Sequence, residues 1–229
     1  MKRFYLLILI FILGGFHLSA GDGATFVNLG FSDDSRYFGF AQYGISSEET
    51  KPYADIFLVD VKKNAFVQNG SVSGEFPTTI EVGQDGFGAF LTVLTNNTGL
   101  FDTYRIDYLK SGRLVYILVN GAQPKSVLEF RDFEKEKKFR VSLVQEQFGS
   151  GDTVSSSFHI SLIVSDRDGR SREYTIGLPN YRRPGVLRYR IHKVFFSPDE
   201  TSLVFVVEKE TVDSGGVNIR YMVETVSIQ

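Results

Sequence analysis

The residue types that most often carry catalysis or bind metals are scarce in this chain of 229 residues, which has no cysteine and three histidines. His159 and His192 lie beyond the first twenty residues, and neither has a second histidine or a carboxylate at the short spacing typical of a metal site. Both are better explained as strand histidines whose side chains are exposed to solvent or form a single hydrogen bond. We therefore predict no histidine metal centre.

The stretch Asp166-Arg167-Asp168-Gly169 resembles the beginning of a calcium loop, because Asp-x-Asp-Gly supplies oxygen ligands and a turn. A full loop would continue with further oxygen ligands and an acidic residue, but here Arg170 and Arg172 follow. Asp-Gly between two alternating apolar runs is also a strong hairpin signal. The hairpin interpretation is favoured.

Other catalytic patterns are equally weak. The sequence holds no Gly-x-Ser-x-Gly elbow, and Ser150 and Ser155–Ser157 belong to a Gly/Ser-rich stretch that would hold a nucleophile poorly. The glycine-rich run Gly83–Gly88 lacks the lysine of a phosphate-binding loop. A pair of carboxylates for glycoside hydrolysis stays open, because such a pair forms in space and not in sequence. We predict no specific catalytic, cofactor-binding or metal-binding residue, and no cofactor.

The densest basic cluster is Arg182-Arg183, with Arg188 and Arg190 close behind. Such a cluster can bind an anionic ligand or a partner protein, but charge clusters are more often solvated, and a solvated loop is favoured here.

The first twenty residues have the layout of a secretory signal peptide. Lys2-Arg3 precede an apolar run from Phe4 to Phe16, and His17–Ala20 leads to a predicted cleavage point before Gly21. The run is shorter than the roughly 20 residues that span a bilayer, which favours cleavage over a retained anchor. We expect a periplasmic or secreted protein with no membrane span after cleavage.

Composition predicts a globular β protein. Hydrophobic residues make up 42% and charged residues 23% of the chain, with 21 Phe, 11 Tyr and 22 Gly. Without cysteine, a lipid anchor at that residue and disulfides are excluded. A formal net charge of −2 argues against nucleic-acid or anionic-membrane binding. No long linker appears, so we predict one domain over residues 21–229.

Turn signals recur at the short spacing of an all-β chain. One segment favours a helix near 87–95, because Phe87, Phe90, Leu91 and Leu94 form one face and Asp85 offers an N-cap. Residues 69–74 are predicted as a loop and residues 77–82 as a strand. The other predicted strands are 25–31, 37–43, 54–61, 104–108, 114–119, 127–133, 139–145, 158–165, 172–176, 189–196, 202–207 and 217–228.

The clearest pattern is an internal repeat, in which Phe31–Phe40 aligns without a gap with Phe196–Phe205. Each copy predicts a strand, a polar turn and a second strand, and the position where such a turn favours glycine holds Ser35 or Glu200. Downstream, Ile56–Asp60 is matched with Arg220–Glu224. The repeat units therefore span residues 25–61 and 189–228.

Two resemblances follow from these residues. Phe196-Ser197-Pro198-Asp199 resembles the turn of WD40-like blades in periplasmic propellers such as that of the Tol system. This implies propeller-like antiparallel sheets, with a β-sandwich as the alternative, because only two blades are clear. The segment from Ala24 to Phe40, continuing to Ile56, is similar to an uncharacterised family of predicted secreted bacterial proteins, which implies export and no known activity.

The predicted function is a non-catalytic binding or interaction module of the cell envelope, whose partner is an unidentified envelope protein or small ligand. Repeated strand units present their loops on one rim, and the equivalent loops Gly44–Tyr53 and Thr211–Val217 are the predicted binding loops. The alternative is an envelope hydrolase that uses carboxylates, for example on glycan.

Overall fold

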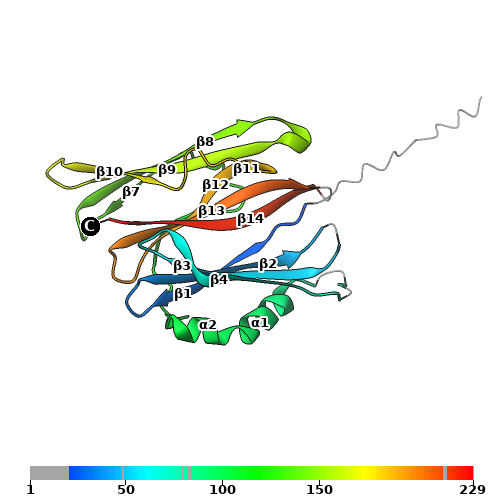
Figure 1. The fold of residues 1–229 in the computed structure, drawn as a ribbon. Coiled ribbons are helices and arrows are strands. Elements are labelled where there is room, and N and C mark those ends of the chain that lie inside the picture. The colour runs from blue at the N-terminus through cyan, green and yellow to red at the C-terminus, as the bar shows by residue number, and fades with distance from the viewer. Residues whose placement is uncertain (1–20, 48, 79, 82–83, 214–215, 229) are drawn as a thin grey trace, which may run out of the picture.

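A computed structural model describes residues 21–228, except 48, 79, 82–83 and 214–215. The predicted signal peptide, residues 1–20, lies outside the described residues. The described chain forms three antiparallel sheets and two short helices (Figure 1).

The N-terminal sheet has the strand order β4-β3-β2-β1-β5. Its strands are β1 (Thr25–Ser32), β2 (Tyr37–Ile45), β3 (Pro52–Asp60), β4 (Ala65–Glu75) and β5 (Ile106–Asp107). The helices α1 (Phe87–Asn96) and α2 (Thr98–Thr103) cover one face of this sheet (Figure 1).

The central sheet has the order β14-β13-β12-β6 and the outer sheet the order β10-β9-β8-β7, with β11 also paired to β9. The central strands are β6 (Arg113–Ile117), β12 (Val186–Phe196), β13 (Ser202–Asp213) and β14 (Gly216–Ser227). The outer strands are β7 (Val127–Asp132), β8 (Lys137–Phe148), β9 (Ser155–Ser165), β10 (Ser171–Ile176) and β11 (Arg183–Pro184), and a single 3-10 turn, Gly151–Thr153, precedes β9.

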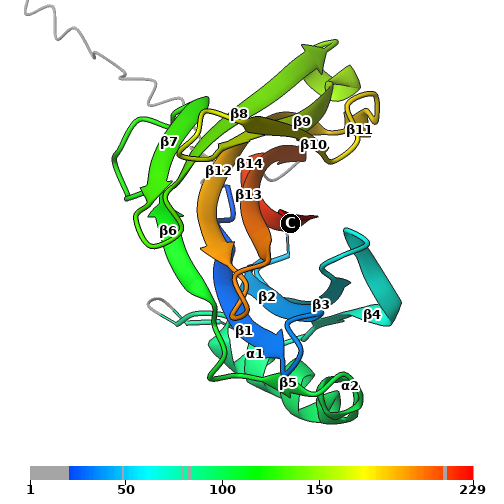
Figure 2. The same ribbon diagram turned by 90° about the vertical axis from the view of Figure 1, so that its left-hand side faces the viewer.

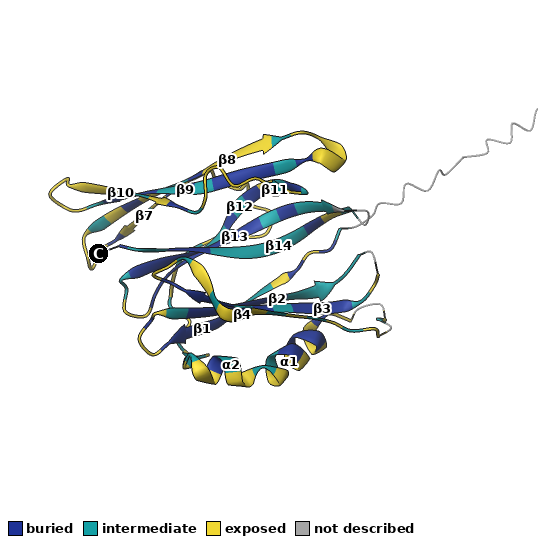
Figure 3. Cartoon of the chain, viewed as in Figure 1, coloured by how far each residue is buried: buried dark blue, intermediate teal, exposed yellow. Residues whose placement is uncertain are grey.

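The sheets stack in layers, and each pair of layers encloses its own core. Residues such as Phe139, Phe158 and Phe205 fill the space between the outer and central sheets. Phe38 and Val206 belong to the core between the central and N-terminal sheets, and a third core lies under α1. The central sheet is thus covered on both faces, whereas the far face of the outer sheet and the far side of the helices are largely exposed (Figure 3).

The prediction of a mainly β, antiparallel fold with a short helix near 87–95 is confirmed. The described strands close into neither a barrel nor a ring of blades, and stacked sheets are compatible with the sandwich alternative. In the side view, the outer, central and N-terminal sheets follow one another as layers that diverge toward one side of the molecule (Figure 2). No helix among the described residues is long and apolar enough to cross a membrane.

The two aligned segments form turns of the same shape. Ser32 Oγ donates to Asp34 Oδ1 at 2.7 Å, and Ser197 Oγ donates to Asp199 Oδ1 at 2.6 Å. The residue at the expected glycine position has a positive φ in both, +57° at Ser35 and +56° at Glu200. The turns also touch, because the Asp199 amide donates to Ser35 Oγ at 3.3 Å.

Three sequence predictions need correction. Residues 69–74 are not a loop but part of β4, an edge strand whose small polar residues face solvent on one side. The described residues of 77–82, namely 77–78 and 80–81, are not in a strand. The third strands of the two units align differently from the predicted match: Tyr37 pairs with Asp60 and its counterpart Ser202 pairs with Ser227, so Asp60 corresponds to Ser227 and not to Glu224.

Candidate functional site

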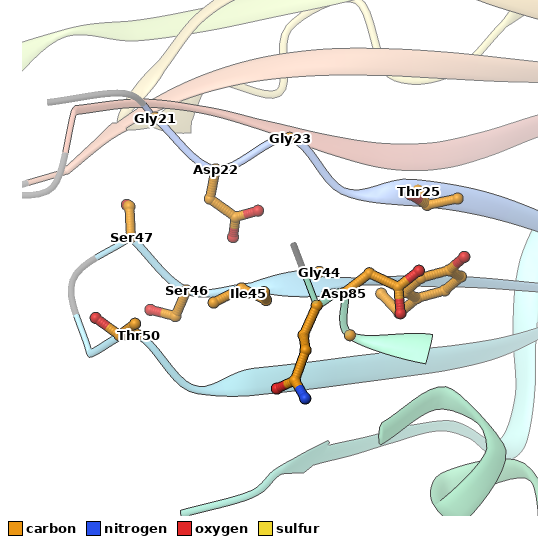
Figure 4. Close-up of a pocket in the computed structure, with 13 residues that line it drawn as sticks. Gly21, Asp22, Gly23, Thr25, Gly44, Ile45, Ser46, Ser47, Thr50 and Asp85 are labelled. Carbon is orange, nitrogen blue, oxygen red and sulfur yellow. The ribbon is translucent and has the colours of Figure 1, made fainter. Parts of the chain in front are cut away.

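A concave site lies at the rim where β2 turns into β3. It has a volume of about 520 Å³ and is lined by three segments that are distant in sequence, within residues 21–25, 43–50 and 84–86 (Figure 4). The predicted loop Gly44–Tyr53 forms part of its wall, although Gly44–Ile45 and Pro52–Tyr53 are strand residues. We call it the rim pocket.

The second predicted loop, Thr211–Val217, lies beside the rim pocket but is mostly strand. β13 runs to Asp213 and β14 begins at Gly216, so only residues 214–215 connect them, and these lie outside the described residues. Ser47 of the first predicted loop reaches the residue that follows the second, because its Oγ donates to Asn218 Oδ1 on β14 at 3.3 Å.

The wall of the pocket is polar. Apart from glycines and backbone, it presents the hydroxyls of Thr25, Ser46, Ser47 and Thr50, the amide of Gln84, the Tyr43 side chain and the carboxylates of Asp22 and Asp85. Among the described residues that line it, none is a lysine or an arginine. Such a wall suits a ligand rich in hydroxyl, amide or amine groups, which can donate to carboxylates and exchange hydrogen bonds with hydroxyls.

Asp22 is held in place by residues of β3 and β14. Its Oδ2 accepts from Arg220 Nη2 at 2.7 Å, and Tyr53 Oη donates to its Oδ1 at 3.3 Å. Burial raises the pKa of Tyr53, so its phenol stays protonated as a donor. The Asp22 side chain is 2% exposed and its charge is balanced by Arg220. Its carboxylate therefore fixes the N-terminal segment and is a poor nucleophile or general base.

Asp85 is the exposed carboxylate of the pocket. It lies just before α1, where its Oδ1 accepts from the Phe87 amide at 3.0 Å. The predicted N-cap role is thus shifted by one residue, because the N-cap position itself is Gly86. A Cβ at Gly86 would lie 2.3 Å from the carbonyl oxygen of Gly44, so only glycine lets this segment approach β2 closely enough to form the pocket wall.

The other sequence candidates lie elsewhere. Asp166 and Gly169 form the predicted hairpin turn between β9 and β10, where the Gly169 amide donates to the Asp166 carbonyl at 3.1 Å. His159 is on β9 of the outer sheet, while His192 is on β12, 3.5 Å from Glu208. No group of three or more His, Asp or Glu side chains suited to a metal occurs in the described part of the chain.

The arginine cluster is solvated only in part, because Arg182 and Arg188 are exposed but Arg183 and Arg190 are largely covered. The side chain of Arg183 is 18% exposed and that of Arg190 20% exposed. Arg188 and Arg190 both pair with Glu210 on β13, and Arg190 also pairs with Glu208. Cross-strand register places these opposite charges together, and that register is not visible in the local sequence.

A family model described as "Predicted secreted protein (DUF2259)" matches residues 39–227. The chain belongs to this family. The match runs from β2 to the end of β14 and so takes in all three sheets, whereas residues 24–38, the first part of the segment that suggested the resemblance, precede it. The DUF2259 family has no assigned activity, and its description agrees with the predicted export. No curated protein and no solved structure matches the chain.

Proposed function

We propose that this member of the DUF2259 family is a non-catalytic binding module of the cell envelope, periplasmic or secreted, and that the rim pocket holds its ligand. The observation that carries the proposal is the convergence of residues 21–25, 43–47 with Thr50, and 84–86 around one polar cavity. Its lining of hydroxyls, an amide and an exposed carboxylate supports an uncharged or cationic polar ligand, such as a glycan or a peptide amine.

The binding proposal is supported over hydrolysis by the state of the two carboxylates. A glycosidase requires two carboxyl groups on either side of the glycosidic bond that is cleaved. One acts as the general acid, and the other acts as the general base or the nucleophile. In the rim pocket Asp85 is exposed and bonded only to the Phe87 amide among the described contacts, but Asp22 is buried and paired with Arg220 at 2.7 Å. One available carboxylate can orient a ligand but does not complete this mechanism.

A pocket-filling substitution tests the proposal. Thr25 is an exposed strand residue in the pocket wall, and Thr175 is an exposed strand residue on β10 of the outer sheet. We expect immobilised Thr25→Trp to lose the envelope proteins and glycans that the wild type captures from an envelope extract, while Thr175→Trp retains them. Equal capture by both variants would show that the rim pocket is not the site.

The same extract separates binding from hydrolysis. We expect no new reducing ends or amines after incubation of envelope glycan with the wild type. If such products form, and Asp85→Asn abolishes them, the hydrolase alternative replaces the binding module.

A further inference from the structure

A second polar cluster adjoins the Arg220–Asp22 ion pair, on the face of the central sheet that carries Val207 and Met222. Lys209 on β13 and Arg220 on β14 are directly opposite each other in the strand register, so their side chains share one face of the central sheet. Like charges in such a pair are destabilising unless anions balance them. Arg220 has its anion, Asp22, at 2.7 Å.

Lys209 has no such partner. Within the described part of the chain it forms no ion pair and no hydrogen bond through its side chain, although it is only partly exposed. Burial lowers the pKa of Lys209, and the positive charges of Arg183 and Arg220 act in the same direction, whereas the charge of Asp55 acts against them. The ammonium group therefore lies in a place where a cation is costly without a counter-charge.

Arg183 brings a second unsatisfied donor to this place from the other sheet. It belongs to β11, and its guanidinium packs over the rings of Tyr181 at 4.9 Å and Phe158 at 5.1 Å. Its Nη1 is buried and has no hydrogen-bond partner. Arg183 forms an ion pair with Glu224, but Glu224 Oε1 lies 4.0 Å from Arg183 Nη2, which is too far for a hydrogen bond.

The carboxylates near this cluster accept their hydrogen bonds from neutral amides and not from Lys209 or Arg183. Asp55 Oδ2 accepts from Gln42 Nε2 at 2.9 Å, and Glu224 Oε2 accepts from Asn64 Nδ2 at 2.5 Å. A buried guanidinium donor without a partner requires an explanation, and a bound anion or water is the ordinary one. Both cations lie beside Tyr189, which is directly opposite Lys209 in the register of β12 and β13 and whose ring lies 5.9 Å from the Arg183 guanidinium. Two cations that meet there from different sheets favour the anion.

We propose that Lys209 and Arg183 form a binding site for a small oxyanion group, a phosphate or a carboxylate, at the junction of β13 and β11. Arg183 would donate from its planar guanidinium and Lys209 would supply a compact charge, a combination suited to oxyanions. The site uses different side chains from the rim pocket, whose lining carries no cation among the described residues. Its ligand is acidic, whereas the rim pocket suits a neutral or cationic one.

Calorimetric titration with inorganic phosphate and, separately, with acetate tests this site at constant ionic strength. We expect saturable binding of at least one of the two to the wild type, and an affinity lower by about tenfold or more in Lys209→Met, because a charge-assisted hydrogen bond is lost. Lys125→Met, at an exposed lysine, is the matched control and should bind like the wild type. If only phosphate or only acetate binds, that result identifies which oxyanion the site takes.

A second variant separates charge from geometry. Arg183→Lys keeps the positive charge but removes the buried Nη1 donor, so we expect weaker binding with the fold retained by circular dichroism. Absence of binding by the wild type to both probes, or equal affinities for the wild type and Lys209→Met, would overturn the proposal. In the absence of phosphate and acetate, Lys209→Met should also have a higher melting temperature than the wild type, because the substitution removes a partly buried cation that lowers the free energy of unfolding.

Discussion

At the scale of single residues, the two matched turns depend on a buried serine. Ser32 is 2% exposed, its Oγ donates to Asp34, and the Tyr37 amide donates back to that Oγ at 2.9 Å. The same two bonds recur at Ser197, where the Ser202 amide donates to Oγ at 3.0 Å. The hydroxyl therefore joins the end of one strand to the beginning of the next.

We expect Ser32→Ala to lower the free energy of unfolding by about 1–3 kcal/mol, because it leaves a buried amide unpaired. The Ser32 hydroxyl also holds the pKa of Asp34 below its ordinary value. That part of the stabilisation is present above the unfolded pKa of 3.8 and is lost as the pH falls through the folded one, so the difference between wild type and variant should shrink in acid.

Chemical denaturation from pH 2.5 to 7 and an NMR titration of the Asp34 carboxyl measure the two effects. Ser71→Ala, at an exposed serine of β4, is the control and should change neither. An unchanged Asp34 pKa in Ser32→Ala would mean that the hydroxyl does not set it.

Residue patterns predicted these turns well and the buried charges poorly. The Ser-x-Asp spacing is local, so the sequence alone indicates the turn. The sequence suggests that Arg183 and Arg190 are solvated, because the residues that cover them are distant along the chain. Arg183 packs on Phe158 and Arg190 pairs with Glu208, and sheet pairing and packing bring these residues together.

At the scale of elements, the free edge of β14 is sealed. The Ile219 amide donates to the Asp22 carbonyl at 2.7 Å. The Tyr221 amide donates to Gln42 Oε1 and the Thr225 amide to Asn64 Oδ1, both at 2.7 Å. Groups from the N-terminal segment and the N-terminal sheet thus occupy donors that an unprotected edge strand would offer to another chain.

Asn64→Gly tests this seal. Asn64 has φ +50°, which glycine adopts freely, so the substitution removes the side-chain bonds and keeps the turn. We expect a loss of about 1–3 kcal/mol in unfolding free energy and faster hydrogen exchange at Thr225.

The matched control is Asn69→Gly, at an exposed residue with φ +56° and no side-chain bond among the described contacts. Its effect should stay within about 0.5 kcal/mol. Unaltered exchange at Thr225 in Asn64→Gly would show that the edge is protected by other means.

Periodicity predicted most elements, and its failures have physical reasons. The apolar face of 87–94 correctly indicated α1, but α2 was missed because Asn97 and Gly99 look like a stop. β4 was missed because its Asn, Gly and Ser residues resemble a loop, while pairing to β3 makes them a strand. The rim pocket was half predicted: the loop after β2 was identified, whereas residues 21–25 and 84–86 reach it only by tertiary packing.

At the scale of the whole molecule, the central sheet joins two cores. Phe205 and Val206 are neighbours on β13 whose side chains point to opposite faces, one into the core with the outer sheet and the other into the core with the N-terminal sheet. Both are fully buried. The layers therefore depend on the same strand, and we expect them to unfold together.

Phe205→Ala should lower the free energy of unfolding by about 3–5 kcal/mol and Val206→Ala by about 1.5–3 kcal/mol, since each removes buried apolar volume. Because β13 serves both cores, each variant should reduce hydrogen-exchange protection to the same extent in β2 of the N-terminal sheet and in β9 of the outer sheet. Val144→Ala, at a half-exposed position of β8, is the control and should alter protection little in either sheet. Loss of protection confined to β9 in Phe205→Ala, with β2 unchanged, would instead show that the outer sheet unfolds as a separate unit and that the three layers form two independent folding bodies.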